Sequence, residues 1–200
     1  MPRKSKNSLA KRVNRLERVG RPEVKYQSAE SGAFDTIGSV QGTALKPQAL
    51  AEGIGRNQRI GDKVKSRNVR FQAILRMPYE SSSATCAVRI LALRAKFTDP
   101  SVGTASTGDF PNFYSTVDED KFFVLKDVLT QVSSQYWNGS ANDGSSIKKI
   151  KFNLPTGLRK LQYDGSTNQS PSNNEIVIYM VAENQNAEVA YNWQHYYIDN

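Results

Sequence analysis

Residues 68–78, NVRFQAILRMP, alternate apolar and polar side chains with a period of two. That period places every second side chain on one face of an extended backbone, whereas a helix requires a spacing of three or four residues. The stretch is therefore predicted to be a strand with one buried and one solvated face. The buried face is expected to consist of alternate residues: Val69, Phe71, Ala73, Leu75 and Met77.

Further β-strands are indicated along the chain as far as residue 199. Residues 85–97 and 175–183 are apolar on both faces, which is typical of central strands in a sandwich. Further strands are expected at 121–132, 147–155, 158–165 and 188–199. The last of these places Val189, Tyr191, Trp193, His195 and Tyr197 on one face. Loops rich in Gly, Ser, Asn and Asp separate the strands, and no helical stretch alternates with them, so an all-β sandwich or jelly roll is predicted.

Positive charge is concentrated at the beginning of the chain. The first 25 residues contain nine Lys or Arg and two Glu, a net charge of 9 − 2 = +7. The whole chain contains 27 basic and 19 acidic residues, so the remainder contains 18 and 17, a net charge of +1. Such an asymmetry points to a tail that binds a polyanion. The expected phosphate-binding residues of this arm are Arg3, Lys4, Lys6, Lys11, Arg12, Arg15, Arg18, Arg21 and Lys25.

The arm is also predicted to form a short helix. Leu9, Val13, Leu16 and Val19 follow a helical spacing, and Gly20 and Pro22 would end the helix. A helix of about 12 residues is marginal in water without a partner. Three interpretations are open: a nucleic-acid arm without sequence preference, a localisation tail, and a helix lying on a membrane surface.

The remaining organisation is simple. Residues 26–51 are polar and aperiodic and are interpreted as a linker that ends in a first, irregular edge segment, so that 1–25 would be the arm and 52–200 the β domain. No apolar run reaches about 18 residues, so no membrane partner is expected. A second basic cluster, Lys148, Lys149 and Lys151, lies in a predicted strand, and Arg67 and Arg70 lie in another. These residues form either a solvated face or a basic lining that continues the work of the arm. Aromatic residues do not interleave with them in the sequence, so base stacking is not indicated.

Residues suited to catalysis are scarce. His195 is the single histidine and Cys86 the single cysteine, and both lie in apolar strands where packing roles are expected. No Cys/His cluster has the spacing of a zinc site. The glycines of residues 53–61, GIGRNQRIG, do not match a nucleotide-binding motif. The chain is therefore not expected to be an enzyme.

Several segments together resemble the coat proteins of very small icosahedral viruses, in particular those of the satellite tobacco necrosis virus kind. The segments are 53–71 (GIGRNQRIGDKVKSRNVRF), 120–131 (DKFFVLKDVLTQ), 151–165 (KFNLPTGLRKLQYDG) and 196–200 (YYIDN). The first resembles the approach to the first jelly-roll strand of such coats. Similar coats occur in some circular single-stranded DNA viruses.

The resemblance implies a single jelly roll of eight antiparallel strands with a basic helical arm, and a T=1 shell of about sixty copies. The arms would point inward onto a single-stranded RNA or DNA genome, in a virion assembled in the host cytoplasm or nucleus. It also implies calcium, with Asp199 and a neighbour's Glu17 as candidate ligands beside carbonyls near Ile60 and Lys63. Ile54 and Gly55 stand where such coats have acidic residues, so a second calcium site on the three-fold axis is not expected. The alternative is a non-viral, monomeric nucleic-acid-binding β protein with a basic tail.

Overall fold

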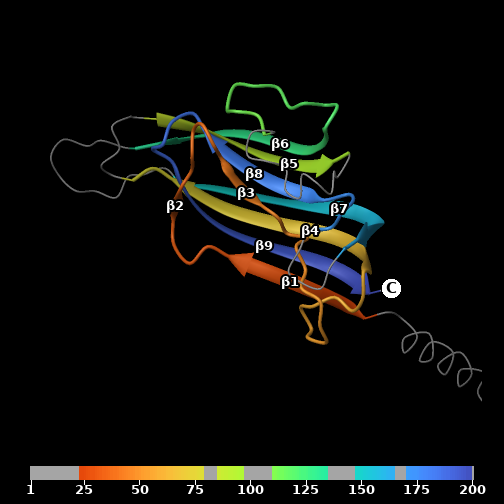
Figure 1. Ribbon diagram of the computed structural model, residues 1–200. Coiled ribbons are helices and arrows are strands. Elements are labelled where there is room, and N and C mark those ends of the chain that lie inside the picture. The colour runs from red at the N-terminus through yellow and green to blue at the C-terminus, as the bar shows by residue number, and fades with distance from the viewer. Residues whose placement is uncertain (1–22, 79–84, 97–109, 135–146, 165–169, 200) are drawn as a thin grey trace, which may run out of the picture.

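The computed structural model describes residues 23–78, 85–96, 110–134, 147–164 and 170–199. These residues form two antiparallel sheets packed face to face, a β-sandwich without a helix in the described ranges (Figure 1). The strands are β1 (Val24–Glu30), β2 (Asp35–Thr36), β3 (Thr43–Leu45), β4 (Lys63–Arg76), β5 (Thr85–Ala95), β6 (Phe122–Ser133), β7 (Lys148–Gln162), β8 (Ile176–Ala182) and β9 (Glu188–Asp199). The predicted all-β class is confirmed.

Strands that follow one another along the chain mostly lie in opposite sheets. One sheet has the order β1-β9-β4-β7, with β2 beside β9, and is called the first sheet below. The second sheet has the order β3-β8-β5-β6. Apart from β5 and β6, which are hydrogen-bonded neighbours, and the short β2, each strand is followed by one in the opposite sheet. Figure 1 shows the first sheet as the lower layer and the start of β1 beside the C-terminal end of the chain.

The core lies between the sheets and follows the predicted alternation. Val69, Phe71, Ala73, Leu75 and Met77 are all buried there, as the period-two pattern of residues 68–78 predicts. The inward face of β9 is confirmed as well: Val189, Trp193, His195 and Tyr197 are buried, and Tyr191 packs against the core.

Strand β8 is buried along its whole length because both of its faces are covered. Its inner face contributes to the main core, while Val177, Tyr179 and Val181 pack outside the sheet against the segment around Phe110 and Phe113. The rings of Phe110 and Tyr179 stack with centroids 4.6 Å apart. The run is apolar on both faces because one face packs in the core and the other is covered by the segment around Phe110 and Phe113, which agrees with the prediction of a central strand.

Three predictions about strands need correction. Residues 147–155 and 158–165 were expected as two strands, but they form the single strand β7 across Gly157 and Leu158, whose φ angles are 63° and 57°. Nine strands are described rather than eight, because a two-residue strand, β2, pairs with β9. The segment 53–71 does not lead to the first strand, because three strands precede β4.

The range 26–51, expected to be a linker, contains most of β1 and all of β2 and β3. Strand β1 gives no alternating apolar signal because its inward positions are Lys25, Gln27 and Ala29. The lysine is tolerated there because its ammonium group lies 2.6 Å from the carboxylate of Asp199 in β9. A polar strand that is neutralised by a distant partner has no signature in its own sequence.

Candidate nucleic-acid interface

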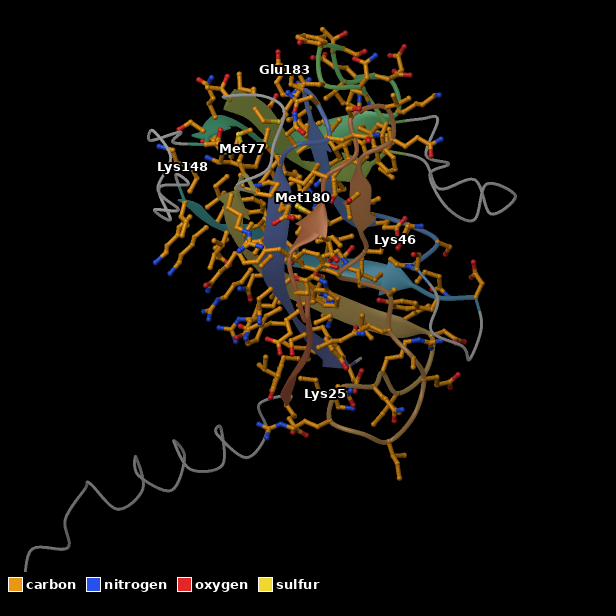
Figure 2. All side chains as sticks on the ribbon, turned by 90° about the vertical axis from the view of Figure 1, so that its left-hand side faces the viewer. Lys25, Lys46, Met77, Lys148, Met180 and Glu183 are labelled. Atoms are coloured by element: carbon orange, nitrogen blue, oxygen red, sulfur yellow. The ribbon has the colours of Figure 1, made fainter. Side chains whose placement is uncertain are left out.

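The outward face of the first sheet carries exposed cations. Arg70 of β4 and Lys149 and Lys151 of β7 all point away from the core, since their neighbours Phe71, Ile150 and Phe152 point into it. Lys151 lies opposite Gln72 and Lys149 opposite Ile74, so the lysines form one row beside β4. The predicted common face of Lys149 and Lys151 is confirmed. In Figure 2, nitrogen-tipped side chains gather along this side of the molecule between Lys148 and Lys25.

Two other predicted residues are placed differently. Lys148 is exposed, but it is the first residue of β7 and lies on the same side of the strand as the inward-facing Ile150. It therefore lies at the rim of the sheet rather than on the cationic face. Lys25 is buried, pairs with Asp199 and donates a hydrogen bond to the Gln58 carbonyl at 3.1 Å. Its charge is therefore satisfied within the chain, and Lys25 is removed from the set of phosphate-binding candidates.

The remaining residues of the predicted arm lie outside the described residues, together with its helix and the candidate ligand Glu17. They are Arg3, Lys4, Lys6, Lys11, Arg12, Arg15, Arg18 and Arg21. The chain that follows them enters the first sheet at Val24, the first residue of β1, which pairs with Ile198. The arm is thus connected to the same sheet that bears the cationic face.

Aromatic side chains stand beside the cations on this face. Tyr26 of β1 lies opposite Tyr196 of β9, with ring centroids 6.1 Å apart. The Arg70 guanidinium lies over the Tyr196 ring at 4.9 Å, and that of Arg56 lies 5.7 Å from the centre of the Tyr26 ring. The sequence interpretation missed this cluster because its members come from three separate strands and a loop. Only the strand pairing brings them together.

The proposed calcium ligand Asp199 is already engaged. One carboxylate oxygen faces the Lys25 ammonium, and the other accepts a hydrogen bond from the Ile60 backbone amide at 3.3 Å. Within the described ranges, no group of three or more His, Cys, Asp or Glu residues could hold a metal ion. A lysine at this position stands where a cation would have to bind, so the residues around Asp199 do not fit calcium.

A cluster of buried polar side chains, His195, Ser66 and Gln48, lies inside the sandwich. The Nε2 atom of His195 lies 2.9 Å from the Ser66 hydroxyl, which accepts a further hydrogen bond from Gln48 at 3.1 Å. Complete burial lowers the pKa of His195 to about 3, so the imidazole is neutral at ordinary pH. Cys86 is also buried, and burial raises the pKa of its thiol. Both residues therefore have the packing roles expected of them.

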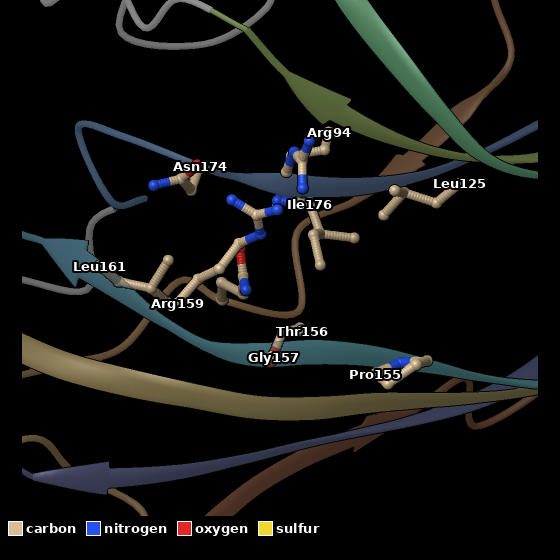
Figure 3. Close-up of a pocket in the computed structure, with 10 residues that line it drawn as sticks. Arg94, Leu125, Pro155, Thr156, Gly157, Arg159, Leu161, Asn174 and Ile176 are labelled. Carbon is tan, nitrogen blue, oxygen red and sulfur yellow. The ribbon is translucent and has the colours of Figure 1, made fainter.

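A cavity of about 410 Å³ opens between the edges of the two sheets (Figure 3). Arg94 of β5 and Arg159 of β7 extend toward one another across it, and Thr156 and Leu125 also line it. Burial, and secondarily the charge of Arg159, lower the pKa of Arg94. The cavity thus holds two like charges near each other, and it lies between the sheets rather than on the cationic face.

No family model and no curated protein matches the chain. A solved structure of Desmodium yellow mottle tymovirus is similar at 11% sequence identity, covering 90% of this chain and 83% of that one, with a TM-score of 0.37. Among the described residues, no helix is long and apolar enough to cross a membrane.

Proposed function

We propose that this protein is a viral capsid protein that assembles with copies of itself into an icosahedral shell and packages a single-stranded genome. The observation that carries the proposal is the separation of charge, +7 in the first 25 residues and +1 in the rest. A nearly neutral body can pack against identical copies without strong repulsion, whereas a cationic tail neutralises phosphates and releases their counterions. The proposed role is structural, without a catalytic step.

The strand order supports a jelly roll as the fold of the shell domain. Without the short β2, eight strands divide into two sheets of four, with the chain crossing between sheets at every step except β5 to β6. From that arrangement we infer a double-sheet jelly roll, an architecture found in viral capsids, lectins and cupins. The fold alone does not separate these classes, and the charge distribution is what favours a capsid protein.

The edge of the second sheet supports self-assembly. Among the described residues, strand β6 pairs only with β5, and it exposes Phe123, Val124 and Leu129, the last of them to 67%. An exposed apolar edge strand is a site at which another chain can pack or pair. We assign this edge to contacts between copies of the chain, and the outward face of the first sheet to the genome.

The test is deletion of residues 1–22, which leaves every described strand in place. Full-length particles purified after nuclease treatment should contain protected nucleic acid, and the truncated protein should lose most of it. Digestion of the extracted nucleic acid with a ribonuclease or a deoxyribonuclease then identifies the cargo as RNA or DNA. Equal amounts of protected nucleic acid in both proteins would contradict the role of the arm. A monomeric nucleic-acid-binding protein, the alternative, would bind but protect none.

A further inference from the structure

We propose that Tyr26, Tyr196 and Arg70 form a base-stacking site for single-stranded nucleic acid on the outward face of the first sheet. This inference rests on the proposed function, and it adds that bases, not only phosphates, contact the shell domain. It follows from planar groups that the fold brings together at the surface, away from the hydrophobic core.

The geometry of the cluster is compact. The two tyrosine rings lie 6.1 Å apart with their planes inclined by 35°. The Arg70 guanidinium lies 4.9 Å from the centre of the Tyr196 ring, and its Nη1 atom lies 3.4 Å from the hydroxyl of that tyrosine. The same hydroxyl donates a hydrogen bond to the Gln194 side chain at 2.9 Å. These contacts hold the Tyr196 ring in one orientation before any ligand binds.

The cluster is open to a ligand from outside. Tyr26 is 40% exposed although its ring is an apolar surface of the kind that usually finds cover. Arg70 is exposed as well, so one plane of the guanidinium is available after the other has stacked on Tyr196. Bases of single strands stack on tyrosine rings and on guanidinium planes, whereas those of a duplex are already stacked on each other.

Charges and amides beside the cluster suit the rest of a nucleotide chain. Arg70 lies opposite Asn153 on β7 and opposite Gln194 on β9. One step farther along the sheet, Lys151 lies opposite Gln72, and Lys149 follows it. The lysines can bind phosphates while the aromatic cluster binds bases, which is the division of contacts found in binders of single strands. The nearest carboxylate on this face of β1 is Glu30, opposite Asn192.

The experiment compares two probes with the same number of phosphates: a short thymidine oligonucleotide and an abasic oligonucleotide of equal length. Fluorescence anisotropy is measured with the full-length protein at a salt concentration that weakens the electrostatic contribution of the arm. The wild-type protein should bind the thymidine probe more tightly than the abasic probe. The double variant Tyr26→Leu/Tyr196→Leu should weaken thymidine binding by roughly 5- to 150-fold, the loss of about one stacked base, and leave abasic binding unchanged.

Four further variants make the result specific. Tyr196→Phe keeps the ring and should retain the preference for bases. Tyr114→Leu removes a tyrosine that is 76% exposed in the segment covering the second sheet, and it should change neither affinity. Lys149→Gln/Lys151→Gln should lower the affinity for both probes by the same factor. Should the double leucine variant fail to fold, as judged by circular dichroism, Tyr26→Leu alone, at an exposed edge position, should still reduce the preference.

The outcomes separate this inference from the proposed function. Equal binding of both probes by the wild type, with no effect of the leucine variants, overturns the base-stacking site and leaves packaging by charge intact. A wild-type protein that binds neither probe overturns the nucleic-acid role and the stacking site together.

Discussion

The buried imidazole of His195 makes the stability of the sandwich depend on pH. In the folded protein its pKa is about 3 because burial disfavours the charged form, whereas an unfolded chain has a histidine pKa of about 6.5. The folded-state pKa is therefore the lower one. The stability contributed by the neutral imidazole is fully present above pH 6.5 and is lost as the pH falls toward 3, since the unfolded chain then binds the extra proton.

The size of the effect follows from these two values. Lowering the pH from 7 to 5 should cost about 2 kcal/mol of unfolding free energy through this group alone. Urea unfolding of the unassembled protein, followed by tryptophan fluorescence, measures the free energy at both pH values; Trp193 is buried in the same strand. In the variant His195→Gln, whose amide can still bond to the Ser66 hydroxyl, this part of the pH dependence should disappear.

Carboxylates and other groups contribute equally to both proteins, so the difference between them isolates His195. An equal loss of stability between pH 7 and pH 5 in the wild type and the glutamine variant would refute the assignment of a buried neutral imidazole.

Three more predictions concern single charges. Asp199→Asn should destabilise the protein by about 3 kcal/mol in urea unfolding because it leaves the charge of the buried Lys25 unpaired. The double variant Lys25→Met/Asp199→Asn should recover most of that loss; a loss equal to the sum of the two single losses would contradict the pairing. Calcium added to the wild type should leave the melting temperature unchanged, since Lys25 neutralises Asp199 and the Ile60 backbone amide donates a hydrogen bond to the same carboxylate. A clear rise of the melting temperature, measured by calorimetry, would support a calcium site at Asp199. Arg159→Gln should stabilise the protein by about 0.2–1 kcal/mol by relieving the repulsion of Arg94, an effect that shrinks in high salt; no gain at low salt would show that the two guanidinium groups do not interact.

The strands that the sequence predicts well are those whose own residues alternate or are apolar throughout. Strands β5, β8 and β9 were predicted within two residues of their observed ends because burial on one or both faces leaves a local signal. Strand β4 was predicted from the alternation of residues 68–78, but it begins five residues earlier, at Lys63. Strand β1 was missed because its inward positions include Lys25 and Gln27, and the ion pair that permits this involves Asp199, more than 170 positions away.

The candidate site divides in the same way. Lys149 and Lys151 could be placed on one face from their spacing within a single strand. The contact of Tyr26 with Tyr196 and the approach of Arg94 to Arg159 could not, because each depends on which strands are neighbours and in what register. Sheet order is a property of the whole chain, so residues far apart in the sequence share a surface without any local pattern that indicates it.

The central claim, self-assembly into a closed shell, is tested most directly by sedimentation velocity of the purified full-length protein over a range of salt concentrations, with the peak fractions viewed by electron microscopy. The account predicts a single fast-sedimenting species made of uniform particles. A protein that stays at 22.3 kDa under every condition, with no particles in any fraction, would contradict it.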